Sequence, residues 1–104
     1  MSGWIGVDFD GTLAVYGVGQ GADGAPVPAM LARIKQWVDQ GIEVRIVTAR
    51  AECPIQTGRV EDWLIDHGLP PLIVTNKKDF GMIQLWDDRA VAVEANTGRI
   101  LGGA

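Results

Sequence analysis

The sequence predicts one α/β domain over residues 1–104, a three-layer sandwich with a mainly parallel, Rossmann-like sheet. Short apolar runs alternate along the chain with segments of helical periodicity, which is the pattern of a parallel sheet with crossover helices. The apolar runs lack polar-apolar alternation, as is typical of strands that are covered on both faces. Because 47% of the residues are apolar, the chain can build one small hydrophobic core.

The first strand is predicted at Trp4 to Val7, where an apolar run is closed by the turn sequence Asp8-Phe9-Asp10-Gly11. The following segment, Gly17 to Pro28, is rich in glycine and proline. Both residue types disfavour helix and central strand. We therefore expect a surface loop there, leading into a helix that begins near Pro28.

The middle of the chain predicts two helices on either side of a second strand. Apolar residues between Met30 and Gln40 recur three and four positions apart, and Gly41 supplies a stop. Ile42 to Val47 then predicts the second strand. A second helical pattern covers Val60 to His67 and is halted by Gly68.

The last third of the chain predicts two more strands and a hairpin. The strands are Leu72 to Val74 and Met82 to Trp86, and Val91 to Glu94 can pair with Arg99 to Leu101 across the turn Asn96-Thr97-Gly98. Only seven residues link the third and fourth strands, fewer than a helical crossover needs. We therefore expect this link to run nearly extended across the sheet.

Reactive side chains follow each of the four predicted strands. Because the carboxyl ends of parallel strands meet at one edge, and ligands bind there, these side chains are expected to converge. They are Asp8 and Asp10 after the first strand, Thr48 after the second, Lys77 and Lys78 after the third, and Asp87 and Asp88 after the fourth.

This set of residues favours chemistry on a phosphate ester. Four aspartates at one edge repel one another unless they are protonated or bind a cation. Carboxylate oxygens suit Mg²⁺, which shares its remaining positions with substrate phosphate. One carboxylate can then attack phosphorus, a second can protonate the leaving oxygen, and a hydroxyl and an ammonium can contact the phosphoryl oxygens.

The same motifs resemble those of the haloacid dehalogenase superfamily. Asp8-Phe9-Asp10-Gly11-Thr12-Leu13 is similar to the first family motif, and Thr48 in Ile46-Val47-Thr48-Ala49-Arg50 to the second. Lys78 or Lys77 resembles the third motif and Asp87-Asp88 the fourth. The motifs stand in the family's order and span nearly the whole chain.

The resemblance implies a role for each matching residue. Asp8 would be the nucleophile, Asp10 the general acid and base, Thr48 a phosphoryl contact and Lys78 the charge-neutralising partner. Mg²⁺ would be held by Asp8, the backbone carbonyl of Asp10, and Asp87 or Asp88. Ala49, Arg50 and Lys77 are further candidates for substrate binding, although an ion pair with a neighbouring acidic residue is an equal alternative for Arg50. The aspartate two positions after the nucleophile is associated with phosphatases and phosphotransferases rather than dehalogenases.

The resemblance further implies a capless member of the family. The segments from Val15 to Pro28 and from Thr48 to Val60 are too short for a folded cap domain. An open site suits a phosphate on a large molecule, or a small substrate held by oligomeric partners. The run Asp87-Asp88-Arg89-Ala90 also resembles small phage and bacterial members and the phosphatase half of phage polynucleotide kinases, so a nucleotide or polynucleotide phosphate is a candidate substrate.

Charge and composition limit the kinds of binding partner and the cellular location that we expect. The formal charge of -4, without long runs of Lys or Arg, argues against an extended nucleic-acid groove. No stretch is apolar enough for a membrane span, and the N-terminus lacks the pattern of a secretory signal. With Cys53 as the single cysteine, no internal disulfide forms. These features predict a soluble cytoplasmic protein.

Two alternatives compete with an enzyme. The first is a binding or regulatory module that keeps the same fold but turns over slowly. The second is a signalling receiver domain, which also uses aspartates, threonine and lysine on a doubly wound sheet. Receiver domains place the phosphorylated aspartate on a middle strand, whereas here the third strand is followed by Thr75-Asn76, which disfavours that class.

Overall fold

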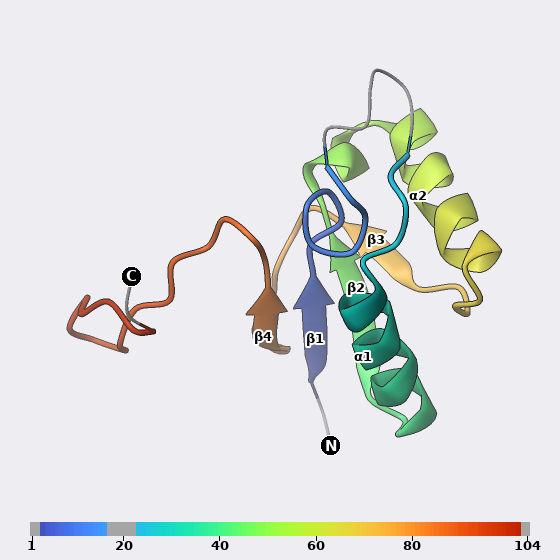
Figure 1. The fold of residues 1–104 in the computed structure, drawn as a ribbon. Helices are drawn as coiled ribbons and strands as arrows, with labels where there is room; N and C mark the ends of the chain where they lie inside the picture. The colour runs from blue at the N-terminus through green and yellow to red at the C-terminus, as the bar shows by residue number, and fades with distance from the viewer. Residues whose placement is uncertain (1–2, 17–22, 103–104) are drawn as a thin grey trace.

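The computed structural model describes residues 3–16 and 23–102, which form a small α/β fold around a four-stranded, all-parallel sheet (Figure 1). Its elements in chain order are β1 (Trp4–Val7), α1 (Pro28–Asp39), β2 (Glu43–Val47), the 3-10 turn η1 (Ala49–Glu52), α2 (Pro54–Asp66), β3 (Ile73–Thr75) and β4 (Met82–Trp86). The strand order is β3-β2-β1-β4. β1 is therefore flanked on both sides, and its carboxyl end lies in the middle of the sheet edge.

Both helices pack on one face of the sheet. Strand pairing aligns Ile5 with Val44 and Val7 with Ile46, so these four side chains project from the same face. They share one buried cluster with residues of both helices, namely Met30 and Ile34 of α1 and Val60, Trp63 and Leu64 of α2. This cluster is the core that holds β1 and β2 in place beneath the site.

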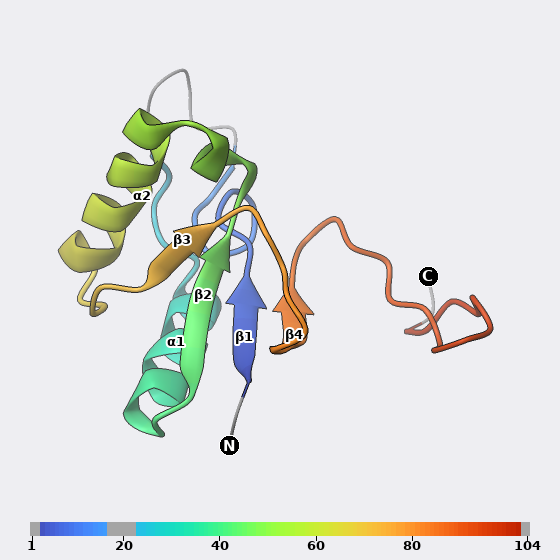
Figure 2. The same cartoon turned by 180° about the vertical axis from the view of Figure 1, so that it is seen from behind.

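The opposite face of the sheet is covered by a stretch of irregular chain. Trp4 points to this face because its neighbour Ile5 points to the helices. Trp4 Nε1 donates to Asp79 Oδ1 at 2.8 Å, and the Trp4 amide donates to the carbonyl oxygen of Gly81 at 2.8 Å. These bonds anchor the link between β3 and β4, which runs from one edge of the sheet to the other, as Figure 2 shows in orange.

The predicted third layer is not confirmed, because no helix in the described part of the chain covers this second face. The expectation that every strand is covered on both sides is correspondingly wrong for the outer strands. Ile83 and Leu85 of β4 are 48% and 38% exposed, and Ile73 of β3 is 54% exposed. The physical reason is the short β3–β4 link, which has too few residues to form a covering helix.

The helix boundaries follow proline and glycine. α1 begins at Pro28, as predicted, and the chain turns after it at Gly41, where φ is +78°. α2 begins at Pro54, before the apolar pattern that predicted it. Proline suits the first helical position because its missing N–H has no partner to lose. None of residues 54–59 is buried, so this first part of α2 carries no periodic apolar signal.

The ends of the predicted glycine-rich loop meet beside the start of α1. The Val15 amide donates to the carbonyl oxygen of Ala25 at 2.8 Å, and the Val27 amide donates to that of Leu13 at 2.7 Å. Most of the loop, residues 17–22, lies outside the described residues. The described ends therefore tie the turn after β1 directly to α1.

The chain after β4 forms an arm, residues 87–102, that leads away from the sheet (Figure 1). The predicted hairpin is present within it as a single antiparallel bridge between Val93 and Ile100. Its turn uses left-handed backbone at Asn96 and Gly98, where φ is 67° and 77°. Among the described residues, no helix combines the length and apolarity needed to span a membrane.

Candidate functional site

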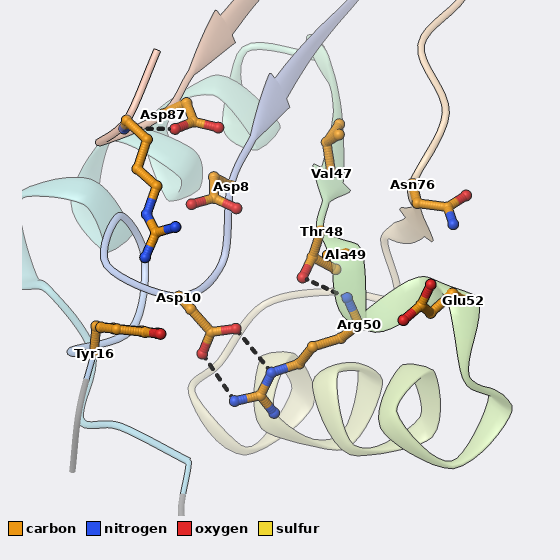
Figure 3. Close-up of a pocket in the computed structure, with 11 residues that line it drawn as sticks. Asp8, Asp10, Tyr16, Val47, Thr48, Ala49, Arg50, Glu52, Asn76 and Asp87 are labelled. Atoms are coloured by element: carbon orange, nitrogen blue, oxygen red, sulfur yellow. Dashed lines mark hydrogen bonds and ion pairs between the residues drawn. The ribbon is translucent and has the colours of Figure 1, made fainter.

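The carboxyl ends of the strands surround a cavity of about 590 Å³. Figure 3 shows Asp8 and Asp87 on one side of it and Thr48, Ala49 and Asn76 on the other. The chain therefore brings together polar groups from the ends of all four strands, as expected for a parallel sheet. The lining residues are Asp8, Asp10, Tyr16, Val47, Thr48, Ala49, Arg50, Glu52, Asn76, Asp87 and Arg89.

Three of the predicted aspartates form one carboxylate cluster. Asp8, Asp87 and Asp88 each offer an oxygen, and these oxygens lie within 4.8 Å of one another. The Asp8 amide donates to the carbonyl oxygen of Trp86 at 2.9 Å, which fixes the end of β1 against the end of β4. An all-carboxylate donor set fits a hard cation such as Mg²⁺. The side chain of Asp10 lies outside this set, and its predicted contact with the metal through its backbone carbonyl stays a prediction.

The turn after Asp8 is shaped to admit Asp88. Gly11 adopts a φ of +89°, and a Cβ atom there would lie 2.6 Å from Asp88 Oδ2. Thr12 Oγ1 lies 3.0 Å from Asp88 Oδ1 and 3.4 Å from Asp8 Oδ2, and it accepts a hydrogen bond from the Asp88 amide at 2.9 Å. The Gly-Thr pair of the first motif thus holds the two carboxylates together.

The close approach of these carboxylates shifts the pKa values of Asp8 and Asp88 in opposite directions. The pKa of Asp8 is raised from 3.8 to about 7; burial is the largest cause, and a hydrogen bond with Asp88 and the negative charge of Asp87 contribute in the same direction. The exposed Asp88 has a lowered pKa because Thr12 and Asp8 hydrogen-bond to its carboxylate. In the absence of a cation, Asp8 is therefore the member of the cluster that holds a proton.

We expect the metal-free protein to lose stability as the pH rises from about 4 to about 7. In this interval folded Asp8, with a pKa of about 7, retains a proton that the unfolded chain, at 3.8, has released. The folded state binds more protons, so a rise in pH favours unfolding. The lowered pKa of Asp88 places its titration below this interval, where it does not offset the effect.

Urea unfolding in the presence of a chelator, at about pH 5 and about pH 8, measures this loss of stability. The Asp8→Asn variant should show a smaller decrease than the wild type. An equal decrease in both proteins would contradict the assignment of the raised pKa to Asp8.

Asp10 is held by Arg50 from across the cavity. The Arg50 Nε and Nη2 atoms donate to the two carboxylate oxygens of Asp10 at 2.9 Å and 2.8 Å (Figure 3). Such two-point pairing fixes both side chains more firmly than a single contact. Arg50 therefore forms the ion pair that was one of its two predicted roles, and its role in substrate binding stays a prediction.

Arg50 also connects Asp10 to the end of the glycine-rich loop. Its Nη1 atom donates to Asp23 Oδ1 at 2.8 Å and to Gln56 Oε1 at 3.2 Å. Asp23 is paired in addition with Arg59 of α2 at 3.3 Å. The guanidinium group thus sits between two carboxylates, and its own pKa is raised chiefly by the hydrogen bond with Asp10.

Thr48 marks the end of β2 and opens η1. Its side chain is buried, with the residue 4% exposed, and its hydroxyl oxygen accepts a hydrogen bond from the Arg50 amide at 3.2 Å. The Thr48 amide donates to the carbonyl oxygen of Thr75, which fixes β2 beside β3. Among the described residues, the Thr48 hydroxyl group accepts the bond from the Arg50 amide, and Thr48 lies in the wall of the cavity. The 3-10 turn was not predicted, although threonine before a turn is its ordinary N-cap signal.

The two candidate lysines do not line the cavity. Lys77 and Lys78 are exposed on the β3–β4 link, and Asn76 occupies the wall of the cavity at the end of β3. The Lys77 amide donates to Thr75 Oγ1 at 3.0 Å, so the chain turns sharply after the strand. Asp79 then directs the link to the opposite face through its bond with Trp4.

The structure adds residues that the sequence did not single out as site residues. Asn76 lies two residues and Arg89 three residues after a predicted strand end, so their position was a usable signal. Tyr16 lines the cavity and Asp23 pairs with Arg50, but both lie in or beside a loop without periodicity. Their approach to the site depends on how the chain returns to α1, which no local pattern encodes.

The structure is thus a small α/β fold with a cavity at the carboxyl edge of a parallel sheet, the edge at which such sheets commonly bind ligands. Comparison of the chain with protein-family models, with curated proteins and with solved structures found no match. The function is therefore argued from the residues of the site and their geometry.

Proposed function

We propose that this chain is a Mg²⁺-dependent phosphohydrolase of the haloacid dehalogenase type, which cleaves a phosphomonoester through an aspartyl-phosphate on Asp8. The observation that carries the proposal is the carboxylate cluster at the end of β1. One oxygen each from Asp8, Asp87 and Asp88 lies within 4.8 Å of the other two. Thr48 and Arg50 line the same cavity. A nucleophile, a cation site and phosphoryl-binding groups thus share one space.

The chemistry assigns two proton transfers to Asp10. An oxygen of Asp8 attacks phosphorus, the bond to the leaving oxygen breaks, and Asp10 gives that oxygen a proton. Water then attacks the same phosphorus and gives a proton to Asp10, the bond between Asp8 and phosphorus breaks, and inorganic phosphate and free Asp8 are released. Bound Mg²⁺ supplies positive charge that screens Asp8 and the phosphoryl oxygens. Asp87 and Asp88, with Asp8, would hold it.

Arg50 has to release Asp10 before this proton transfer. It binds both carboxylate oxygens at 2.8 Å and 2.9 Å, and a protonated carboxyl group offers a hydrogen where one of those bonds now lies. A phosphoryl group in the cavity competes for the same guanidinium group. We infer that substrate binding draws Arg50 toward phosphate and frees one oxygen of Asp10.

The fold belonging to this function is the Rossmann-like sheet of the superfamily without a cap domain. In support, the described residues lead from β1 and its turn through residues 23–27 into α1, and from β2 through η1 into α2. No folded domain stands in these connections within the described ranges. Charge neutralisation by Lys78, or by Lys77, is part of the proposal and requires one of these exposed side chains to turn toward the cavity.

The test is phosphate release from a panel of phosphorylated metabolites and of oligonucleotides with a 3′- or 5′-phosphate, with Mg²⁺ and with a chelator. We expect turnover of at least one substrate with Mg²⁺ and none with the chelator. Rapid acid quenching should recover a phosphoryl group on the peptide that contains Asp8. Mg²⁺ binding without turnover of any substrate would instead favour the alternative, a slow binding or regulatory module. The pairing of Arg50 with Asp10 is the observation that keeps this alternative open.

A further inference from the structure

Two side chains at the cavity have no role in the proposed phosphoryl chemistry. Tyr16 follows the turn after β1, and Arg89 lies in the arm two residues beyond Asp87; both line the cavity. The Cζ atom of Arg89 stands 5.6 Å from the centre of the Tyr16 ring. The two loops that carry the carboxylate cluster are thus joined at the cavity by an aromatic ring and a guanidinium group.

Neither side chain is explained by packing. Tyr16 is 64% exposed, so its ring contributes little to the hydrophobic core. Within the ranges that the structure describes, the Arg89 guanidinium forms no ion pair, and its positive charge acts on the cluster only by helping to lower the pKa of Asp88. The Arg89 amide donates to Asp87 Oδ1 at 2.7 Å, which fixes the backbone beside the cluster. An exposed ring and a cation are therefore presented to whatever occupies the cavity.

We propose that Tyr16 and Arg89 bind the leaving group of the substrate, and that this group carries a planar aromatic ring, as in a nucleoside monophosphate. The inference rests on the proposed function, which puts the phosphoryl group at Asp8, in the same cavity that Tyr16 and Arg89 line. Aromatic rings and guanidinium planes both stack on nucleobases. The cavity volume of about 590 Å³ lies within the usual range for small-molecule sites.

The experiment compares adenosine 5′-monophosphate with ribose 5-phosphate, which carry the same primary phosphate ester and differ by the base. We expect kcat/KM for the nucleotide to exceed that for ribose 5-phosphate by about 5- to 100-fold, the range that one stacked base provides. In Tyr16→Ala this ratio should fall toward one, and Tyr16→Phe should restore it. Arg89→Gln should lower the ratio as well.

Phe80→Ala is the matched control, because Phe80 is an exposed aromatic residue on the β3–β4 link and does not line the cavity. It should leave the ratio unchanged. A wild-type ratio near one, or a ratio that Tyr16→Ala does not alter, overturns the inference while leaving the proposed phosphohydrolase intact.

Equilibrium binding to the Asp8→Asn protein provides a second reading that does not depend on turnover. We expect the nucleotide to bind more tightly than ribose 5-phosphate, and the Tyr16→Ala change in the same background to remove the difference. This result would support the aromatic subsite even if the wild type hydrolyses neither compound, in which case only the proposed function fails. Equal binding of both compounds would overturn the inference.

Discussion

Asp8→Asn is expected to reduce phosphate release by about a thousandfold or more, because removal of the attacking group of a covalent mechanism leaves only positioning by the rest of the site. Asparagine has nearly the same shape as aspartate and can still hydrogen-bond to Asp88. It also removes the charge that burial and the neighbouring carboxylates disfavour, which is why the pKa of Asp8 is raised to about 7. The variant should therefore fold at least as well as the wild type near neutral pH.

The measurement pairs steady-state phosphate release with urea unfolding of the same preparation, so that lost activity is separated from lost structure. Asp66→Asn is the matched control, because it makes the same chemical change at the exposed end of α2. It should retain wild-type activity. If Asp8→Asn keeps more than about a tenth of that activity, a loss well under the expected magnitude, Asp8 is not the nucleophile.

Phe9→Ala is expected to cost about 3–5 kcal/mol in the free energy of unfolding, as for other buried phenylalanines. Phe9 is fully buried, and its ring meets that of Trp63 edge to face, with ring centres 5.1 Å apart. The Cζ atom of Arg50 lies 5.2 Å from the same ring. A domain of this size has little stability to spare, so a large part of the variant should be unfolded without denaturant.

Thermal and urea unfolding, followed by circular dichroism, measure this cost. Phe80→Ala removes the same side chain from an exposed position and should change the stability by less than about 0.5 kcal/mol. The loss of stability for Phe9→Leu should lie between those for Phe9→Ala and Phe80→Ala, because leucine keeps most of the buried volume. If Phe9→Ala were no more destabilising than Phe80→Ala, the packing of the turn between Asp8 and Asp10 against α2 would be incorrect.

Local patterns predicted much of the fold because each pattern had a single physical cause. The apolar run at Trp4–Val7 and the proline and glycine that bound α1 set those elements directly. The predicted start of α2 was too late in the sequence. None of residues 54–59 is buried, so the first turns of the helix carry no apolar periodicity. The three-layer prediction assumed that every apolar strand is covered on both faces. Strand β4 is not, because it is an edge strand and the link that precedes it is too short to form a covering helix.

The sequence also predicted which side chains would share an edge, since the ends of parallel strands have to meet there. That reasoning predicted a shared edge for Asp8, Asp10, Thr48 and Asp87, and all four line the cavity. It left open which lysine would join them, and in the structure both lie outside the cavity. A strand end fixes the first residue after it, but the direction of the following link depends on its tertiary contacts, here the bond from Trp4 to Asp79.

By itself, the sequence determined the alternation of strands and helices and the presence of a carboxylate-rich edge, because hydrophobic periodicity and turn residues act over a few neighbouring positions. Only the tertiary structure decided the pairing of Asp10 with Arg50, the bridge from Arg50 to Asp23, and the approach of Arg89 to Tyr16. These contacts join segments that are distant along the chain. Their geometry follows from how the core orients the sheet edge and its loops, which no local pattern contains.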